Sequence, residues 1–324
     1  MFVPKSRYLI LLLFSPVFIG CNREPNSNNG ASFAGRKLTV PYTHDSARPI
    51  QVVCTTGMIA DVVRNIGGKH VTVEQLMGED VDPHLYKVSS TDVAKMNRAD
   101  VIFYSGLHLE GKMTDTLERL AKKKPVFAAT EYLDAKSILT DEHKHPDPHA
   151  WFDVALWSDV AKVIGDALGM YDPANKDAYD TNTKKYRAAL AELHDKTKTA
   201  IASIQPREKR VLVTSHDAFR YFGRAYDIDV KGIQGISTDT EASLREVNQL
   251  VDFIVARKVN AVFVETSVNQ RNMKSLQDGC KARGHEVVLG GELFSDAMGK
   301  VGTPEGTYIG MIEHNVDTIV KALR

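Results

Sequence analysis

Along most of this chain, short apolar runs alternate with longer stretches in which apolar residues recur at the helical period. Short apolar runs typical of buried strands occupy 51–54, 71–77, 101–104, 126–129, 211–214, 228–232, 261–265 and 286–289. Between them lie stretches with helical periodicity at 57–66, 112–123, 154–168, 217–226, 241–257, 269–283 and 308–323, and a short helix that begins at Ser90 or Thr91. Because strands that alternate with helices favour parallel pairing, the pattern predicts an α/β protein with two four-stranded, largely parallel α/β lobes.

The middle of the chain breaks this alternation. After Asp172-Pro173, a cap followed by proline, no Gly or Pro occurs until Pro206. One apolar stripe runs through Tyr179, Tyr186, Leu190, Leu193, Thr197, Ile201 and Ile204. A helix of this length spans ~45 Å, about the height of a two-lobed protein. We therefore expect a single long rigid helix over 172–205 that joins an N-terminal lobe (49–171) to a C-terminal lobe (206–324). A coiled coil with another chain is the competing interpretation.

The first 48 residues have a different character. Lys5 and Arg7 precede an apolar run over 8–19, which at twelve residues is too short for a bilayer span of ~20 residues. Gly20-Cys21 ends this run as in a bacterial lipobox, so residues 1–20 are expected to be a lipoprotein signal peptide and Cys21 the lipidated residue. Ordinary secretion, or a fortuitously apolar start, are the alternatives. Residues 21–48, rich in Asn, Ser, Gly and Pro, read as a flexible tether.

Composition narrows the class of protein. The net charge is zero, charged residues make up 25% and apolar residues 43%. This balance excludes a disordered chain and leaves no basic excess for nucleic acid. Cys54 and Cys280 are expected to be buried small residues, although a single bridge between them is the alternative.

Two copies of one tripeptide carry the first sign of chemistry. Asp82-Pro83-His84 and Asp147-Pro148-His149 are each followed by an aromatic residue, Tyr86 or Trp151. Proline fixes its own φ and restricts the residue before it, so both histidines sit on stiffened loops. Imidazole is a common ligand of transition metals. The repeat therefore indicates two loops that converge on one metal ion.

His216 and Asp296 are the candidates for two further ligands. Each of the four residues follows a predicted strand: His216 comes two residues after 211–214, and Asp296 follows 286–289 across Gly290-Gly291. Ligands of open parallel sheets bind beyond the carboxyl ends of the strands, so a shared site between two lobes is expected. Helix-capping roles for the residues around His216, and for Asp296 itself, are the alternatives.

Four segments resemble the signatures of one family in the correct order. They are Asp82-Pro83-His84-Leu85-Tyr86, Asp147-Pro148-His149-Ala150-Trp151-Phe152, Ser215-His216-Asp217-Ala218-Phe219 and the run from Gly290 to Gly299. The family is the TroA-type zinc- and manganese-binding lipoproteins of ABC metal importers, and the similarity extends from about Gln51 to Arg324. The resemblance implies that His84, His149, His216 and Asp296 hold the transported Zn²⁺ or Mn²⁺ between the lobes. It also implies an exported, lipid-anchored monomer that docks on a cognate ABC permease.

Departures from the family pattern bear on the metal. Manganese-type relatives often carry glutamate at the position of His216, whereas many zinc-type relatives have a long His-rich loop before the second tripeptide. Here that loop is only 141–146, and His143 and His145 are read as solvated or as a weak auxiliary site. Three imidazoles and one carboxylate suit Zn²⁺ and tolerate Mn²⁺.

Three expectations concern mechanism. Metal affinity should fall as the pH drops through the histidine range near ~6.5, because the ligands must lose protons. Asp217, Glu265 and Ser237 are candidates to hold the imidazole rings. A zinc hydrolase, which would keep an open coordination position for water, and a surface adhesin are the alternative functions.

Overall fold

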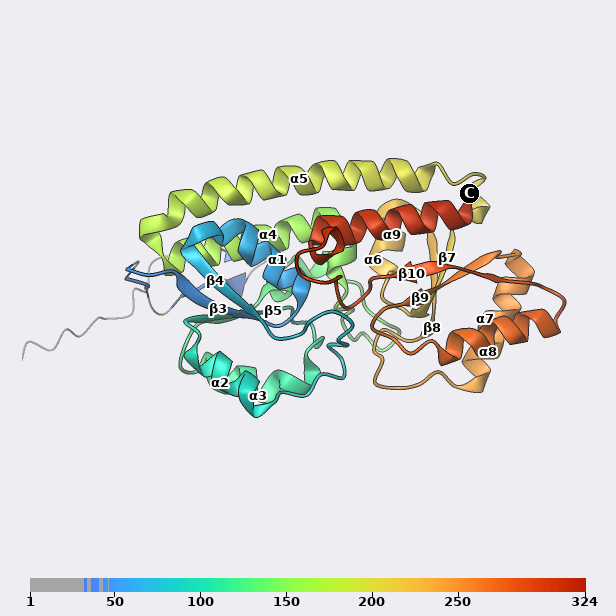
Figure 1. The fold of residues 1–324 in the computed structure, drawn as a ribbon, viewed down its shortest axis with the longest axis horizontal. Coiled ribbons are helices and arrows are strands. Elements are labelled where there is room, and N and C mark those ends of the chain that lie inside the picture. Colours follow the sequence, from blue (N-terminus) through green and yellow to red (C-terminus); the bar gives the residue numbers. More distant parts are fainter. Residues whose placement is uncertain (1–31, 34–35, 41–42, 46) are drawn as a thin grey trace, which may run out of the picture.

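The computed structural model describes residues 32–33, 36–40, 43–45 and 47–324. Two α/β lobes lie side by side along the long axis of the molecule, and helix α5 (Lys176–Ala202) runs across both (Figure 1). This arrangement confirms the predicted fold class. The predicted signal peptide and Cys21 lie outside the described residues. Among the residues that are described, none of the helices could cross a membrane.

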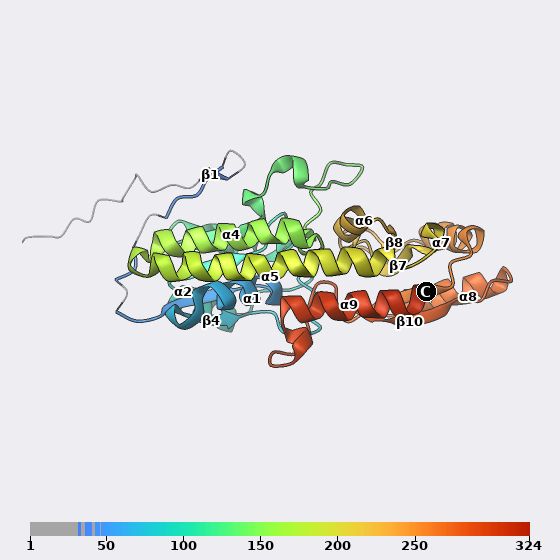
Figure 2. The ribbon, with the colours of Figure 1, turned by 90° about the horizontal axis from the view of Figure 1, so that it is seen from above.

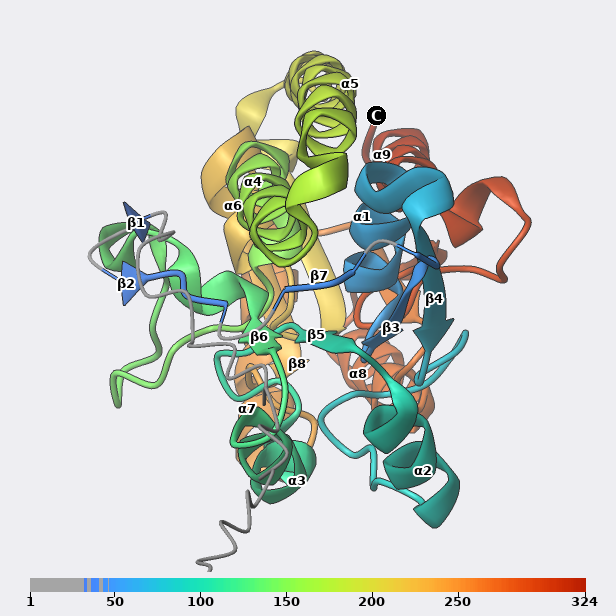
Figure 3. The same ribbon diagram turned by 90° about the vertical axis from the view of Figure 1, so that its left-hand side faces the viewer.

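The N-terminal lobe contains one parallel sheet in the order β4-β3-β5-β6. Its strands are β3 (Ile50–Cys54), β4 (Val71–Gln75), β5 (Val101–Tyr104) and β6 (Val126–Ala128). Helices α1 (Gly57–Gly67) and α4 (Val154–Tyr171) cover one face, and α2 (Ser90–Arg98) and α3 (Thr114–Ala121) cover the other (Figure 3). Because the strands are parallel, all their carboxyl ends point the same way, toward the second lobe (Figure 1).

The C-terminal lobe is built from two parallel pairs of strands. The pairs are β7 (Val211–His216) with β8 (Asp229–Gln234) and β9 (Ala261–Glu265) with β10 (Val288–Leu293), and β7 lies next to β9. The helices are α6 (Arg220–Tyr226), α7 (Leu244–Arg257), α8 (Arg271–Ala282) and α9 (Tyr308–Leu323). The four predicted strands are thus present, but their hydrogen bonds form two ladders.

Strands β7, β8 and β10 extend further toward their carboxyl ends than the sequence pattern predicted. Strand β10 continues through Gly290-Gly291 to Leu293, with a register shift between Leu289 and Gly291. A Cβ atom on Gly290 would lie 2.7 Å from the Phe263 ring, so the glycine permits close packing within the strand. Strand β7 includes His216, which was predicted to lie two residues beyond its end.

Helix α5 buries the predicted stripe against helices of its own chain. Tyr179, Tyr186, Leu190, Leu193 and Ile201 are all buried, and α5 packs on α4 and α1 in one lobe and on α9 and α6 in the other (Figure 2). The helix begins at Lys176, after a short 3₁₀ turn over Pro173–Asn175. Since these helices cover the stripe, a coiled-coil partner is not needed to explain it.

Part of the segment expected to be a tether packs on the N-terminal lobe. Leu38 and Val40 are buried in the main hydrophobic core. The backbone N–H of His44 donates to the Tyr171 carbonyl at 2.6 Å, and Arg48 forms a bidentate pair with Asp100 at 2.6 and 2.8 Å. The apolar residues within 38–40 therefore bring the chain onto the lobe before residue 49. Cys54 and Cys280 are both buried and unpaired.

Candidate metal centre

His84 is presented by the loop between β4 and α2. Asp82 Oδ1 accepts a hydrogen bond from the backbone N–H of His84 at 2.8 Å. Two residues further on, the Tyr86 hydroxyl donates to Asp92, whose carboxylate forms a capping box with Ser89 at the start of α2. The first Asp-Pro-His tripeptide is therefore tied to a helix N-terminus, which fixes the direction of the loop.

His149 is held by the carboxylate of its own tripeptide. Asp147 Oδ1 accepts hydrogen bonds from the His149 backbone N–H at 3.1 Å and from His149 Nδ1 at 2.7 Å. This bond assigns the Nδ1 proton and leaves Nε2 free to bind a metal. The Trp151 indole N–H donates to the Ser295 carbonyl across the lobe boundary at 3.1 Å.

His216 and Asp296 come from the C-terminal lobe. His216 ends β7, and Glu265 at the end of the neighbouring β9 accepts from its backbone N–H at 2.9 Å and from Nδ1 at 2.5 Å. Asp296 follows β10 on a segment that Asn315 of α9 fixes through two hydrogen bonds to the backbone of Phe294, at 2.9 and 2.7 Å. Both ligand candidates are therefore supported from within one lobe.

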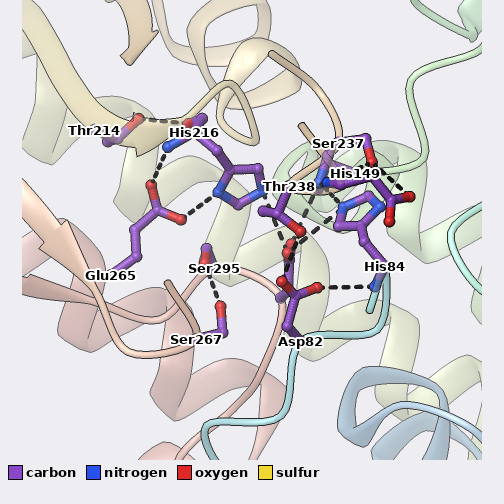
Figure 4. A network of polar contacts seen from close by, with 12 residues as sticks. Asp82, His84, His149, Thr214, His216, Ser237, Thr238, Glu265, Ser267 and Ser295 are labelled. Atoms are coloured by element: carbon purple, nitrogen blue, oxygen red, sulfur yellow. Dashed lines mark hydrogen bonds and ion pairs between the residues drawn. The ribbon is translucent and has the colours of Figure 1, made fainter. Parts of the chain in front are cut away.

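The structure brings all four predicted residues together in a buried cluster. Figure 4 shows its three histidines, His84, His149 and His216. His149 Nε2 lies 3.4 Å from His84 Nε2, 3.3 Å from His216 Nε2 and 3.3 Å from Asp296 Oδ1. Asp296 Oδ2 lies 3.3 Å from His216 Nε2 and 3.6 Å from His84 Nε2. A tetrahedron with metal–ligand bonds of 2.0–2.1 Å has edges of roughly 3.3 Å. These five distances are close to that length, and all four donor atoms lie within 4.8 Å of one another, so the cluster is compact enough to hold one transition-metal ion.

The charges of the cluster are strongly coupled. Burial opposes protonation of His149, but Asp147 and Asp296 outweigh it and raise its pKa to about 9. The pKa of His216 is also raised despite burial, by Glu265 and Asp296. Burial and the two neighbouring imidazoles lower the pKa of His84 to about 4. The neighbouring carboxylates thus favour the protonated forms of His149 and His216, whereas burial favours the neutral form of His84.

Asp296 is the residue that most clearly requires a cation. Burial alone would raise its pKa, but His216 and His149 hold that pKa well below its usual range. Its two oxygens are buried and receive no hydrogen bond from the described residues. A buried carboxylate without hydrogen bonds is costly unless a positive charge satisfies it. In the metal-free site His149 and His216, each 3.3 Å away, supply that charge, and a divalent cation among these four side chains would take their place.

The residues that hold the rings were only partly predicted. Glu265 holds His216 as predicted. Asp217 and Ser237 hold no ring: Asp217 lies 3.6 Å from Arg220, and Ser237 pairs with Asp239. Asp147 was missed as a ring partner, although its place two residues before His149 was the available signal. His143 and His145 are exposed on their loop, where His145 pairs with Asp141, and they do not join the cluster.

A cleft of about 300 Å³ lies next to the loop that carries His84. Residues from both lobes line it, including Asp82 and Leu85 from the first tripeptide loop and Thr238 and Glu241 from the C-terminal lobe. Among the four candidate ligands, His84 is the most exposed, at 5%. None of the four candidate ligands lines the cleft, which approaches the cluster only through Asp82 and Leu85, on either side of His84 in the loop.

Comparisons with known proteins place this site in a family. The family model described as zinc-uptake complex component A, periplasmic (ZnuA), matches residues 52–322. The chain belongs to this family. It is 47% identical over 276 residues to the manganese-binding lipoprotein MntA of Bacillus subtilis, a match that covers 85% of this chain and 90% of that protein.

Solved structures of the family share the fold. The periplasmic zinc binding protein TroA from Treponema pallidum aligns with a TM-score of 0.83 and 46% identity, over 85% of this chain and 99% of that one. The Fe(III)-bound YtgA from Chlamydia trachomatis aligns with a TM-score of 0.77 and 28% identity, over 85% of this chain and 98% of that one. The named metals differ among these relatives, so the family alone does not fix the metal of this chain.

Proposed function

We propose that this ZnuA-family protein captures one Zn²⁺ or Mn²⁺ ion between its lobes and delivers it to the permease of an ABC importer. His84, His149, His216 and Asp296 would be the ligands. The observation that carries the proposal is the buried carboxylate of Asp296, which receives no hydrogen bond from the described residues and lies 3.3 to 3.6 Å from three imidazole nitrogens.

The ligand set favours binding over hydrolysis. A catalytic zinc usually keeps three protein ligands and an open position for water, whereas four protein ligands close the tetrahedron. Here the four ligand atoms lie within 4.8 Å of one another in a buried site. The donor set therefore supports a carrier of the ion.

Zn²⁺ is the ion that the donor chemistry favours. Nitrogen-rich sites follow the Irving–Williams order, which places Zn²⁺ above Mn²⁺. Since one relative is named for manganese and another for zinc, uptake of Mn²⁺ by this chain would depend on availability and on the geometry of the site.

We further propose that the chain acts outside the cytoplasm as a lipid-anchored monomer. Support comes from the apolar run over 8–19 followed by Gly20-Cys21, and from relatives that are named lipoproteins. Lipidation at Cys21 would keep the ion carrier near its permease.

Transport by reconstituted components tests this function. Vesicles that contain the cognate permease should accumulate radioactive Zn²⁺ or Mn²⁺ only when the wild-type protein and ATP are supplied. The Asp296→Ala variant should not support uptake. Equal uptake with this variant, or none with the wild-type protein, would refute the proposal.

A further inference from the structure

Helix α6 of the C-terminal lobe holds the loop that carries His149 in the N-terminal lobe. Arg220 Nη2 donates to the Thr140 carbonyl at 2.9 Å. The Tyr221 hydroxyl donates to the Asp147 carbonyl at 2.9 Å and accepts from the Leu139 N–H at 3.0 Å. The second Asp-Pro-His loop therefore belongs to one lobe by sequence but is fixed by the other.

Arg220 also reaches the carboxylate that orients His149. Asp147 is fully buried, and its Oδ1 atom is occupied by the backbone N–H and Nδ1 of His149. Its Oδ2 atom lies 3.4 Å from Arg220 Nη1, and in the described part of the chain no other donor bonds to it. A buried carboxylate needs a compensating charge, and the planar fork of arginine can serve a carbonyl and a carboxylate together.

We propose that Arg220 is a positioning residue of the metal site, which acts through Asp147 to fix the ring of His149. The inference rests on the proposed function, because it assigns a role in binding the same ion. Glu265, which holds His216, lies in the same lobe as its histidine. The support of His149, in contrast, crosses between the lobes. Separation of the lobes would therefore loosen His149, so that lobe movement and metal release are coupled.

Helix α6 offers a matched control for this role. One turn after Arg220, Arg224 makes the same kind of contact between the lobes: Nη1 donates to the Ser137 carbonyl at 2.7 Å, and Nη2 lies 3.2 Å from Asp153. Arg224 contacts neither Asp147 nor His149. Arg220→Gln and Arg224→Gln thus each remove one arginine bridge, but only the first removes the charge beside Asp147.

The test measures Zn²⁺ dissociation into excess chelator by stopped flow, for wild type, Arg220→Gln, Arg220→Lys and Arg224→Gln. Loss of a residue that hydrogen-bonds a metal ligand typically lowers metal affinity 10–100-fold. Arg220 contacts Asp147, which in turn holds His149, so its effect should lie at the lower end of this range. We therefore expect dissociation about 10-fold faster for Arg220→Gln. Arg220→Lys should be intermediate, because lysine keeps the charge without the fork, and Arg224→Gln should match wild type.

Two controls separate positioning from general destabilisation. In thermal unfolding of the metal-free proteins, both glutamine variants should lower the midpoint temperature by similar amounts. In an Asp147→Asn background, Arg220→Gln should cause no further acceleration, because its effect passes through Asp147. Equal rates for Arg220→Gln and Arg224→Gln, or full additivity with Asp147→Asn, would overturn the assignment. Failure of the wild-type protein to bind either Zn²⁺ or Mn²⁺ would instead refute the proposed function.

Discussion

At the scale of single residues, the four ligand candidates are not equivalent to the residues that orient them. His216→Ala or Asp296→Ala removes a donor from a closed four-ligand set, so Zn²⁺ affinity should fall by more than about 100-fold while the fold persists. Glu265→Gln should weaken affinity by about 10–100-fold, since only the hold on His216 is lost. Chelator competition measures affinity and circular dichroism checks the fold. Unchanged affinity in both ligand variants would contradict the assignment.

The metal-free charges of the site predict a particular dependence on pH. The pKa values of His149 and His216 are raised, so both rings carry protons at neutral pH, whereas the lowered pKa of His84 leaves it neutral. Binding at pH 7 should therefore release about two protons per ion. Affinity should keep rising as the pH increases toward 9, a higher window than free histidine near ~6.5 implies.

Calorimetry in buffers of different ionisation enthalpy counts these protons. Because the raised pKa values favour the protonated metal-free site, that site should lose stabilisation as the pH passes about 9. Release of no protons at pH 7 would show that the rings are already neutral before the metal binds.

The four residues that the structure brings together could be named from sequence, but most of the contacts that support them could not. His84 and His149 were marked by a repeated tripeptide, and placement after strands marked His216 and Asp296. The two copies of the tripeptide nevertheless differ in use: Asp147 binds the ring of its histidine, whereas the second oxygen of Asp82 accepts from Thr238 of the other lobe. The contact between Asp82 and Thr238 depends on the packing of the lobes, which local sequence does not encode, whereas the spacing of Asp147 and His149 was available from the sequence.

At the scale of elements, helix α5 is the part whose stability matters to both lobes. Leu190→Ala would empty a fully buried position of its stripe and should cost about 2–5 kcal/mol of unfolding free energy. Glu192→Ala, on the exposed face two residues on, should change it by less than about 0.5 kcal/mol. Urea unfolding of the metal-free proteins measures both values. Similar losses for the two variants would show that the stripe does not carry the packing.

Element types were readable from sequence, whereas several boundaries were not. Strand β10 passes through Gly290-Gly291, which looked like a loop because glycine usually ends a strand pattern. Helix α6 begins at Arg220 rather than Asp217, because β7 extends to His216 and leaves room for only a short helix. Both differences arise from tertiary contacts beside the site.

At the scale of the whole molecule, we expect metal binding to cause only small movements of the lobes. Helix α5 packs on both lobes, and α6 and Trp151 add hydrogen bonds between them. Small-angle X-ray scattering of metal-free and Zn²⁺-loaded protein should give the same radius of gyration within error. A clear compaction on loading would indicate a wide hinge instead.

X-ray absorption of the Zn²⁺-loaded protein tests whether three imidazoles and one carboxylate hold the ion. The zinc edge should show four light ligands at about 2.0–2.1 Å, with the multiple scattering of three histidine rings. A sulfur ligand at about 2.3 Å, or a shell with fewer than three imidazoles, would contradict the site formed by His84, His149, His216 and Asp296.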